Sequence, residues 1–219
     1  MFVDAETLAE RAAGVRRRVT AAGSGQEVTL LAVTKGFGPE AVTAAVGAGL
    51  AEVGENYAQE LVDKADALGP AAGAVWHFIG RLQRNKVRHL APYVTLWQTV
   101  DRAELAAEIA RRAPGAAVLV QLNLSGDPGK GGCPPAASDE LVGRARDLGL
   151  DVRGLMGVGP AGPPDAARPG FRDLVERAER LALPVRSIGM SADLEVAVQE
   201  GSTMVRVGRD LFGQRPPRG

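Results

Sequence analysis

Eight short apolar runs recur along the chain, and each is separated from the next by a helical or mixed stretch. They occupy residues 28–33, 50–54, 75–80, 94–100, 117–124, 152–158, 184–190 and 203–208. The first run, VTLLAV, is continuous and rich in β-branched residues, which is typical of a strand buried on both faces. Strands that alternate with helices pair in parallel through right-handed crossovers. Eight such units predict a small (β/α)8 barrel of the TIM type.

A doubly wound open sheet is the alternative architecture for the same alternation of strands and helices. The count of eight favours the barrel, and no proline- or serine-rich linker divides the units into halves. We therefore expect a single α/β domain over residues 1–219. Residues 4–22 carry apolar side chains at helical spacing and predict an extra helix before the first strand. The proline-rich segment 159–170 is predicted to be an irregular surface loop.

The charge balance excludes several classes of partner. The 219 residues include 26 basic and 26 acidic side chains, so no broad positive field attracts nucleic acid or an anionic membrane. A single cysteine, Cys133, cannot form an internal disulfide, and the opening MFVDAETLAERAAG does not resemble a signal peptide. No apolar run reaches the length of a membrane span. We expect a cytoplasmic protein that binds neither nucleic acid nor membrane.

Lysine is rare in this chain, and one lysine stands at the end of a predicted strand. Only four of the 26 basic residues are lysines, namely Lys35, Lys64, Lys86 and Lys130. Lys35 follows the first buried strand, where its side chain either reaches solvent or lies in the mouth of the barrel. In the mouth, partial desolvation would lower the pKa of the amine and free it to attack a carbonyl group.

Other polar residues end or follow the remaining strands, where a barrel of this kind gathers its chemistry. Asn56, His77, Ser191 and Arg206 are among them. Taken singly, each has a simpler explanation, because such residues often cap helices or form hydrogen bonds in the core. The segments IGMSADLEVAVQEG and VRVGRDLFG both turn through glycine into a helix, as do the phosphate loops after the last two strands of such barrels. A reactive lysine facing a phosphate site predicts a phosphorylated carbonyl compound as the ligand.

Eight segments, in order and across nearly the whole chain, resemble the pyridoxal phosphate homeostasis protein family. They are LLAVTK, GENYAQE, WHFIGRLQRNK, TVDR, GKGG, RGLM, GMSADLEVAVQEGSTMVRVG and LFG. The resemblance implies a monomeric barrel similar to the N-terminal domain of alanine racemase. It also implies that pyridoxal 5′-phosphate (PLP) is held as a Schiff base on Lys35.

The same resemblance places Asn56 beside the cofactor, Ser191 and Gly208 at its phosphate group, and Arg206 opposite its pyridine nitrogen. The predicted cofactor-binding residues are Lys35, Asn56, His77, Met190, Ser191, Arg206, Gly208 and Arg209. Arg209 departs from the family, which commonly has a small hydroxyl residue there in contact with the phosphate. The backbone N–H of Arg209 can still donate, and its guanidinium could replace the hydroxyl with an ion pair.

The function that the resemblance implies is a carrier or buffer of PLP, in vitamin B6 homeostasis, with little or no turnover. Arginine opposite the pyridine nitrogen makes the ring a weaker electron sink than a carboxylate would, and no catalytic residue is predicted. Apo forms of PLP-dependent enzymes are candidate recipients.

A PLP-dependent amino-acid racemase is the alternative function. It needs a second acid/base, a tyrosine from a separate β-domain, whereas this chain ends at Gly219 and has only Tyr57 and Tyr93. A Schiff-base aldolase acting on a sugar phosphate would use the same lysine but would hold no coloured cofactor.

Several other sequence features could suggest a binding or catalytic site but are weak evidence for one. GVGPAG at 157–162 matches the dinucleotide fingerprint, yet nearby prolines block the helix that must receive a pyrophosphate. Cys133 lies in a loop with no sign of a low-pKa environment. His77 and His89 have no cysteine or acidic partner at ligand spacing, so no metal site is predicted. Lys86 and Lys130 either mark a second vitamer or anion site or are ordinary exposed charges.

Overall fold

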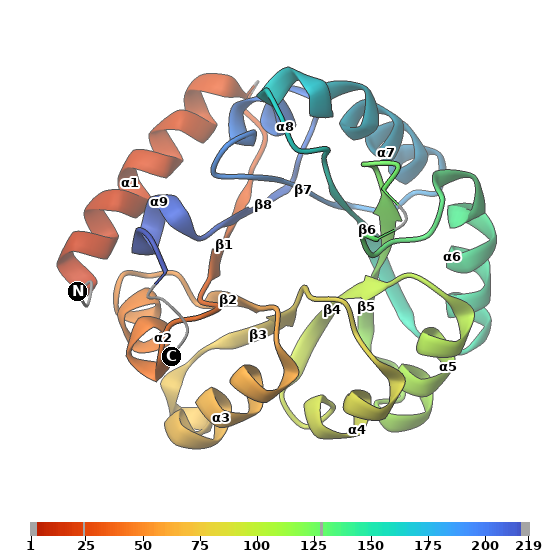
Figure 1. Ribbon diagram of the computed structural model, residues 1–219, viewed down its shortest axis with the longest axis horizontal. Helices are drawn as coiled ribbons and strands as arrows, with labels where there is room; N and C mark the ends of the chain where they lie inside the picture. The colour runs from red at the N-terminus through yellow and green to blue at the C-terminus, as the bar shows by residue number, and fades with distance from the viewer. Residues whose placement is uncertain (1–3, 24, 128, 216–219) are drawn as a thin grey trace.

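The computed structural model describes residues 4–23, 25–127 and 129–215 and shows a closed barrel of eight parallel strands ringed by helices (Figure 1). The strands pair in chain order, and β1 closes the barrel against β8. They are β1 (Thr29–Val33), β2 (Glu52–Glu55), β3 (Val75–Phe78), β4 (Val94–Val100), β5 (Ala117–Asn123), β6 (Asp151–Val158), β7 (Val185–Met190) and β8 (Met204–Val207). The predicted barrel is confirmed, with each strand within a few residues of its apolar run.

Helices follow the strands and cover the outside of the barrel (Figure 1). The α-helices are α1 (Ala5–Ala22), α2 (Pro39–Gly47), α3 (Ala58–Leu68), α4 (Val87–Leu90), α5 (Ala103–Arg112), α6 (Ser138–Asp147), α7 (Arg168–Arg180), α8 (Leu194–Gln199) and α9 (Arg209–Phe212). Short 3-10 helices are η1 (Pro70–Ala72), η2 (Arg84–Lys86), η3 (Pro135–Ala137) and η4 (Pro164–Ala167). Among the helices that the structure describes, none is long and apolar enough to cross a bilayer.

Apolar side chains pack on both faces of the barrel wall. A small cluster inside the barrel consists of Leu31, Leu96, Ala117, Leu119, Met156 and Met204. A much larger cluster lies between the outer face of the strands and the helices, and includes Trp97, Phe78 and Phe171. Burial on both faces explains why the strands appear in the sequence as continuous apolar runs and not as alternating ones.

The predicted extra helix is confirmed as α1, and it completes the outer ring. Asp4 caps it by accepting a hydrogen bond from the backbone N–H of Thr7. In the part of the chain that the structure describes, β8 is followed by the four-residue α9, which is too short to cover the outside of the last strand. Helix α1 packs against α8, α9 and α2, which places it in the part of the ring near β8 and β1 (Figure 1).

The prediction of an irregular loop over residues 159–170 is wrong for its second half. Residues 164–167 form η4, and α7 begins at Arg168. Proline is compatible with the first turn of a helix because the N–H that it lacks would have no intrahelical partner there, so Pro169 does not prevent α7 from starting.

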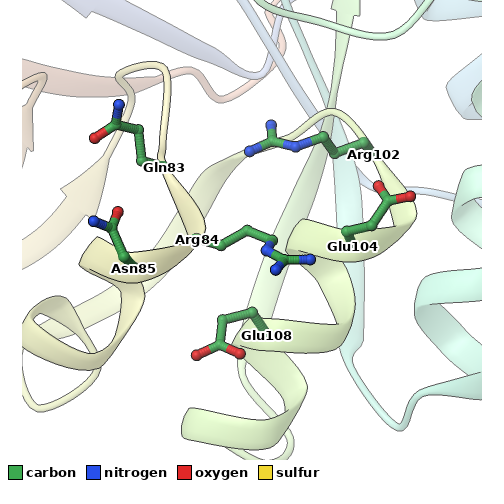
Figure 2. Close-up of a pocket in the computed structure, with 6 residues that line it drawn as sticks. All are labelled: Gln83, Arg84, Asn85, Arg102, Glu104 and Glu108. Carbon is green, nitrogen blue, oxygen red and sulfur yellow. The ribbon is translucent and has the colours of Figure 1, made fainter.

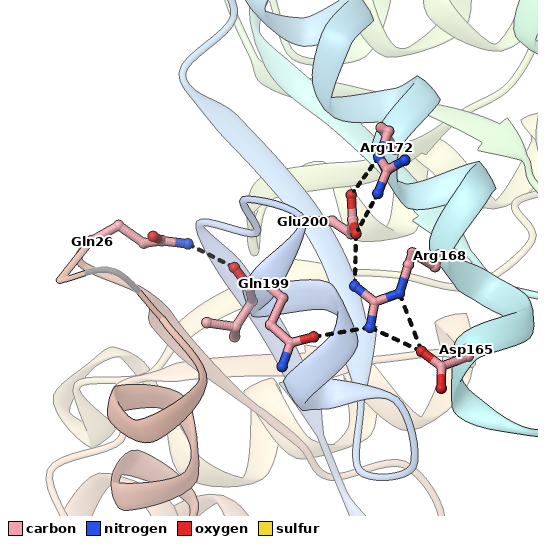
Figure 3. A network of polar contacts seen from close by, with 7 residues as sticks. Gln26, Asp165, Arg168, Arg172, Gln199 and Glu200 are labelled. Atoms are coloured by element: carbon pink, nitrogen blue, oxygen red, sulfur yellow. Dashed lines mark hydrogen bonds and ion pairs between the residues drawn. The ribbon is translucent and has the colours of Figure 1, made fainter.

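Arginines at the start of α7 tie it to the end of α8 (Figure 3). Arg168 donates to Asp165, to the side chain of Gln199 and to Glu200, at 2.7 to 3.1 Å. Arg172 donates to both carboxylate oxygens of Glu200. These contacts hold the C-terminal end of α8 against α7.

Replacing Glu200 with glutamine should therefore lower the free energy of unfolding by about 1 kcal/mol at pH 7. Its arginine partners are 32% and 59% exposed, and solvent weakens such pairs. Hydrogen bonds from Arg172, with Arg168 adding to them, lower the pKa of Glu200. This contribution is present above the unfolded-state pKa and is lost as pH falls through the lowered folded-state value. Urea unfolding at pH 7 and at pH 3 should show the difference from the unaltered chain shrinking in acid. The exposed Glu179→Gln is the control, and a difference that persists at pH 3 would contradict the assignment.

Candidate functional site

A cavity of about 870 Å³ opens at the carboxyl end of the barrel strands. Its lining includes seven of the eight predicted site residues: Lys35, Asn56, Met190, Ser191, Arg206, Gly208 and Arg209. They come from the ends of β1, β2, β7 and β8 and from the loops that follow. The volume is in the range of a pocket for a small organic ligand.

Lys35 lies in a tight turn whose neighbouring residues are held by hydrogen bonds. Thr34 donates its hydroxyl to Glu55 Oε1 at 2.6 Å, and its carbonyl accepts a hydrogen bond from Lys64 Nζ at 2.9 Å. On the other side, the N–H of Gly36 donates to Glu60 Oε2 at 2.8 Å. Gly36 has φ of 78°, which a side chain would disfavour. The backbone on both sides of Lys35 is therefore fixed.

Lys64 and Glu55 form a buried ion pair beneath this turn. Lys64 Nζ lies 2.5 Å from Glu55 Oε1, and the two side chains are 4% and 0% exposed. The second oxygen, Glu55 Oε2, has no hydrogen-bond partner in the described part of the chain. Burial raises the pKa of Glu55, and the charge of Lys64 opposes this shift. Sequence reasoning gave Lys64 no role, because its spacing from Glu60 is that of an ordinary surface pair on a helix.

The pKa of the Lys35 amine is lowered, chiefly by burial and then by the positive charges of Arg215 and Arg206. Glu55 and Glu60 act in the opposite direction but do not cancel the shift. A lower pKa leaves a larger fraction of the amine uncharged at neutral pH, and only the uncharged form attacks a carbonyl. Of the two alternatives for Lys35, the structure places it in the mouth. Arg215, which also lines the cavity, was not predicted.

Arg206 lies at the base of the cavity with its guanidinium held in one orientation. One nitrogen donates to the carbonyl and the hydroxyl of Ser187, at 2.5 and 2.8 Å. The other donates to the carbonyl of Gly157 at 2.7 Å. Burial lowers the pKa of Arg206 to about 10, so the side chain keeps its charge at neutral pH. Arg206 presents a fixed donor to whatever occupies the cavity.

His77 is not among the described residues that line the cavity. It lies inside the barrel in a hydrogen-bonded chain that starts at Arg206: Ser187 Oγ donates to Gln98 Oε1 at 2.7 Å, and Gln98 Nε2 donates to His77 Nδ1 at 2.8 Å. His77 Nε2 lies 2.5 Å from Glu52 Oε2. Because the Gln98 oxygen accepts from Ser187, the Gln98 nitrogen donates to Nδ1 of His77. The imidazole proton is therefore assigned to Nε2, which donates a hydrogen bond to Glu52. His77 therefore supports Arg206 through two intermediate residues, and direct cofactor contact by His77 stays a prediction.

The loops after β2, β7 and β8 bring the remaining residues to the cavity. Asn56 directly follows β2, and Gly80 packs against it so closely that an added Cβ would lie 2.0 Å from the Asn56 carbonyl oxygen. Ser191 Oγ accepts a hydrogen bond of 3.4 Å from the N–H of Asp210. Gly208 is the N-cap of α9 and Arg209 its first residue, and the first backbone N–H groups of a helix have no partner within it. Hydroxyl, amide and backbone donors therefore converge with the guanidinium groups of three arginines around one amine. This donor set fits an anionic carbonyl compound.

A second hollow lies between η2 and α5 and is lined by Gln83, Arg84, Asn85, Arg102, Glu104 and Glu108 (Figure 2). Arg84 reaches across it toward the two glutamates of α5 (Figure 2). It contains mixed charges but neither a lysine nor a cysteine that could attack a carbonyl, and none of the predicted site residues. We therefore place the functional site in the Lys35 cavity.

The described residues offer neither a cluster of metal ligands nor a reactive thiol. Over residues 4–23, 25–127 and 129–215, no three His, Cys, Asp or Glu side chains are grouped so that they could hold a metal ion. Burial raises the pKa of the Cys133 thiol to about 11, so it is protonated and unreactive at neutral pH. This agrees with the sequence interpretation of Cys133 as incidental.

Loss of Lys64 should leave the buried Glu55 carboxylate without its ion-pair partner. We expect Lys64→Met to lower the free energy of unfolding by about 3 to 5 kcal/mol, because removing one partner leaves an uncompensated charge in the interior. Adding Glu55→Gln should recover part of that loss, since the amide removes the charge. Urea unfolding measures both variants, with the exposed Lys86→Met as the control. Equal losses in the single and double variants would show that the ion pair is not the cause.

Comparisons with known proteins identify the family. The model for "Alanine racemase, N-terminal domain" matches residues 3–216. Among curated relatives, the pyridoxal phosphate homeostasis protein of Aquifex aeolicus is 39% identical over 92% of this chain and 93% of its own length. The protein of the same name from Escherichia coli is 37% identical over 95% of this chain and 97% of its own length.

Solved structures give the same result. PipY of Synechococcus elongatus, whose structure was determined with PLP bound, superposes with a TM-score of 0.82. It is 30% identical, and the match covers 94% of this chain and 100% of PipY. This chain belongs to the pyridoxal phosphate homeostasis protein family and has the fold of the alanine racemase N-terminal domain.

Proposed function

We propose that this protein binds PLP in the Lys35 cavity through a Schiff base on Lys35 and carries or buffers the cofactor with little turnover. The observation that carries the proposal is the state of Lys35. Its amine has a lowered pKa, is held in a fixed turn, and faces serine, asparagine and arginine side chains across one cavity. The family membership and the PLP bound to PipY indicate which phosphorylated carbonyl compound fits that set.

Each lining residue has a distinct part in the proposal. The Lys35 amine bonds to the aldehyde carbon and water leaves, so the lowered pKa favours attachment. Ser191 and the N-terminal end of α9, at Gly208 and Arg209, receive the phosphate group, where hydroxyl and backbone N–H groups favour an anion. Asn56 borders the ring, and the Met190 side chain, which is 37% exposed, borders the opening.

The low turnover in this proposal rests on Arg206 and on the composition of the cavity. When bound, PLP supplies an electron sink whose strength depends on the partner of its pyridine nitrogen. Arg206 can donate a hydrogen bond there but has no acceptor, so it does not favour a protonated ring. Neither tyrosine is among the described residues that line the cavity, and Tyr93 donates its hydroxyl to Asp66 instead.

An amino-acid racemase is the second candidate, because the matching family model is that of the alanine racemase N-terminal domain. Lys35 could act as one acid/base, but the described cavity shows no candidate on the opposite side. The apo-enzyme recipients, the monomeric state, the cytoplasmic location and the single domain over residues 1–219 stay predictions.

The first test concerns the attachment point. The protein incubated with PLP should be yellow, and borohydride reduction followed by peptide mass spectrometry should locate the adduct on Lys35. Lys35→Arg should abolish the colour, because the guanidinium is not nucleophilic at neutral pH, while Lys86→Arg should keep it. An adduct of equal yield in Lys35→Arg would reject the assignment.

A second test separates the carrier from the racemase. Losing a general acid/base costs on the order of a hundred- to ten-thousand-fold in rate, so we expect solvent deuterium to enter the α-carbon of alanine far more slowly than in an enzyme. Transfer of PLP to an apo-enzyme should proceed in the same preparation. Rapid exchange with racemisation would contradict the carrier function and favour the racemase function.

A further inference from the structure

One arginine of the extra helix α1 reaches the two loops that lie at the proposed phosphate site. Arg18 Nε lies 2.6 Å from Glu195 Oε1, and Nη1 lies 2.5 Å from Asp210 Oδ2. Nη2 donates to the carbonyl of Ser191 at 3.2 Å and to Glu195 Oε2 at 3.1 Å. A single guanidinium thus contacts the loop after β7, the start of α8 and the start of α9.

These contacted residues are adjacent to those that line the cavity. Ser191 itself lines it, and Asp210 follows Gly208 and Arg209, which also line it. The N–H of Asp210 donates to Ser191 Oγ, so Arg18 spans a pair of loops that are already in contact. Helices α8 and α9 have six and four residues, and helices this short do not hold their own orientation.

Charge gives Arg18 a second effect at the same place. Glu195 and Asp210 would otherwise present two uncompensated carboxylates close to a site for a phosphate dianion. The hydrogen bond from Arg18 lowers the pKa of Glu195, as expected for a compensated carboxylate. The planar guanidinium satisfies both carboxylates and a backbone carbonyl at once, which a lysine ammonium cannot do in the same geometry.

We propose that Arg18 is a positioning residue for the phosphate group of the cofactor, acting through Ser191 and Asp210 from outside the cavity. This inference rests on the proposed function. The Arg18 side chain is 37% exposed, and ion pairs at such positions contribute little to overall stability. Its effect therefore falls on the geometry and charge of the phosphate loops. This gives α1 a role in ligand binding as well as in covering the barrel.

The test compares PLP with pyridoxal, which has the same aldehyde and ring but no phosphate. Dissociation constants for both are measured by absorbance titration with the unaltered protein, Arg18→Gln, Arg18→Lys and Arg17→Gln. Arg17 is exposed on the same helix and makes none of these contacts, so it is the matched control. We expect Arg18→Gln to weaken PLP about tenfold, Arg18→Lys to weaken it less, and both to leave pyridoxal within about twofold. Arg17→Gln should change neither.

The outcomes separate this inference from the proposed function. Unaltered affinity for PLP in Arg18→Gln overturns the positioning role alone. Equal weakening of PLP and pyridoxal also overturns it, because a general loss of structure would affect both ligands. If the unaltered protein fails to take up PLP, the proposed function falls and this inference falls with it. Should Arg18→Gln not fold, the Arg18→Lys comparison of the two ligands decides the question on the same criteria.

Discussion

The buried ion pair between Lys64 and Glu55 is the contact on which the geometry of the site depends. It lies beneath the turn after β1 and binds Thr34 through both its carbonyl and its hydroxyl. Burying two charges is costly unless each is well paired, so the pair is weak evidence for stability and stronger evidence for a fixed local geometry. What it fixes is the direction from which Lys35 enters the cavity. A lysine on a mobile turn would lose its position and much of the desolvation that lowers its pKa.

Arg206 sets the second constraint, because its guanidinium is held in one orientation at the base of the cavity. The guanidinium is oriented by Ser187 and Gly157. Ser187 donates a hydrogen bond to Gln98, and Gln98 in turn donates one to His77. A chain of polar groups inside a barrel is tolerated only when its members are hydrogen-bonded, as they are here. The result is a fixed cation at the base of the cavity. In the proposed function it anchors the ring while leaving it a poor electron sink.

The sequence predicts the architecture and seven of the residues that line the cavity, for identifiable reasons. Buried parallel strands leave continuous apolar runs, and the ends of such strands must meet at one mouth, which brings Lys35, Asn56, Ser191 and Arg206 together. Helical patterns carry no sign that a charged residue is buried, so the sequence predicted no role for Lys64. His77, near the end of the third predicted strand, was predicted at the cofactor. Its ring is hydrogen-bonded to Gln98 and lies against Glu52, and direct contact with the cofactor stays a prediction. Contacts such as those of Arg18 join residues more than 170 positions apart, and spacing within one sequence cannot reveal them.

The central claim is that the fold holds the Lys35 amine in a state ready to attack a carbonyl, and the chain allows this to be measured directly. It has only four lysines, so protein labelled with ¹³C-lysine gives few side-chain signals, and Lys35→Arg assigns the relevant one. An NMR titration of the cofactor-free protein then reports the pKa of each amine. The account predicts that Lys35 titrates below the ordinary lysine value of about 10.4. A Lys35 signal that titrates at or above that value would contradict it.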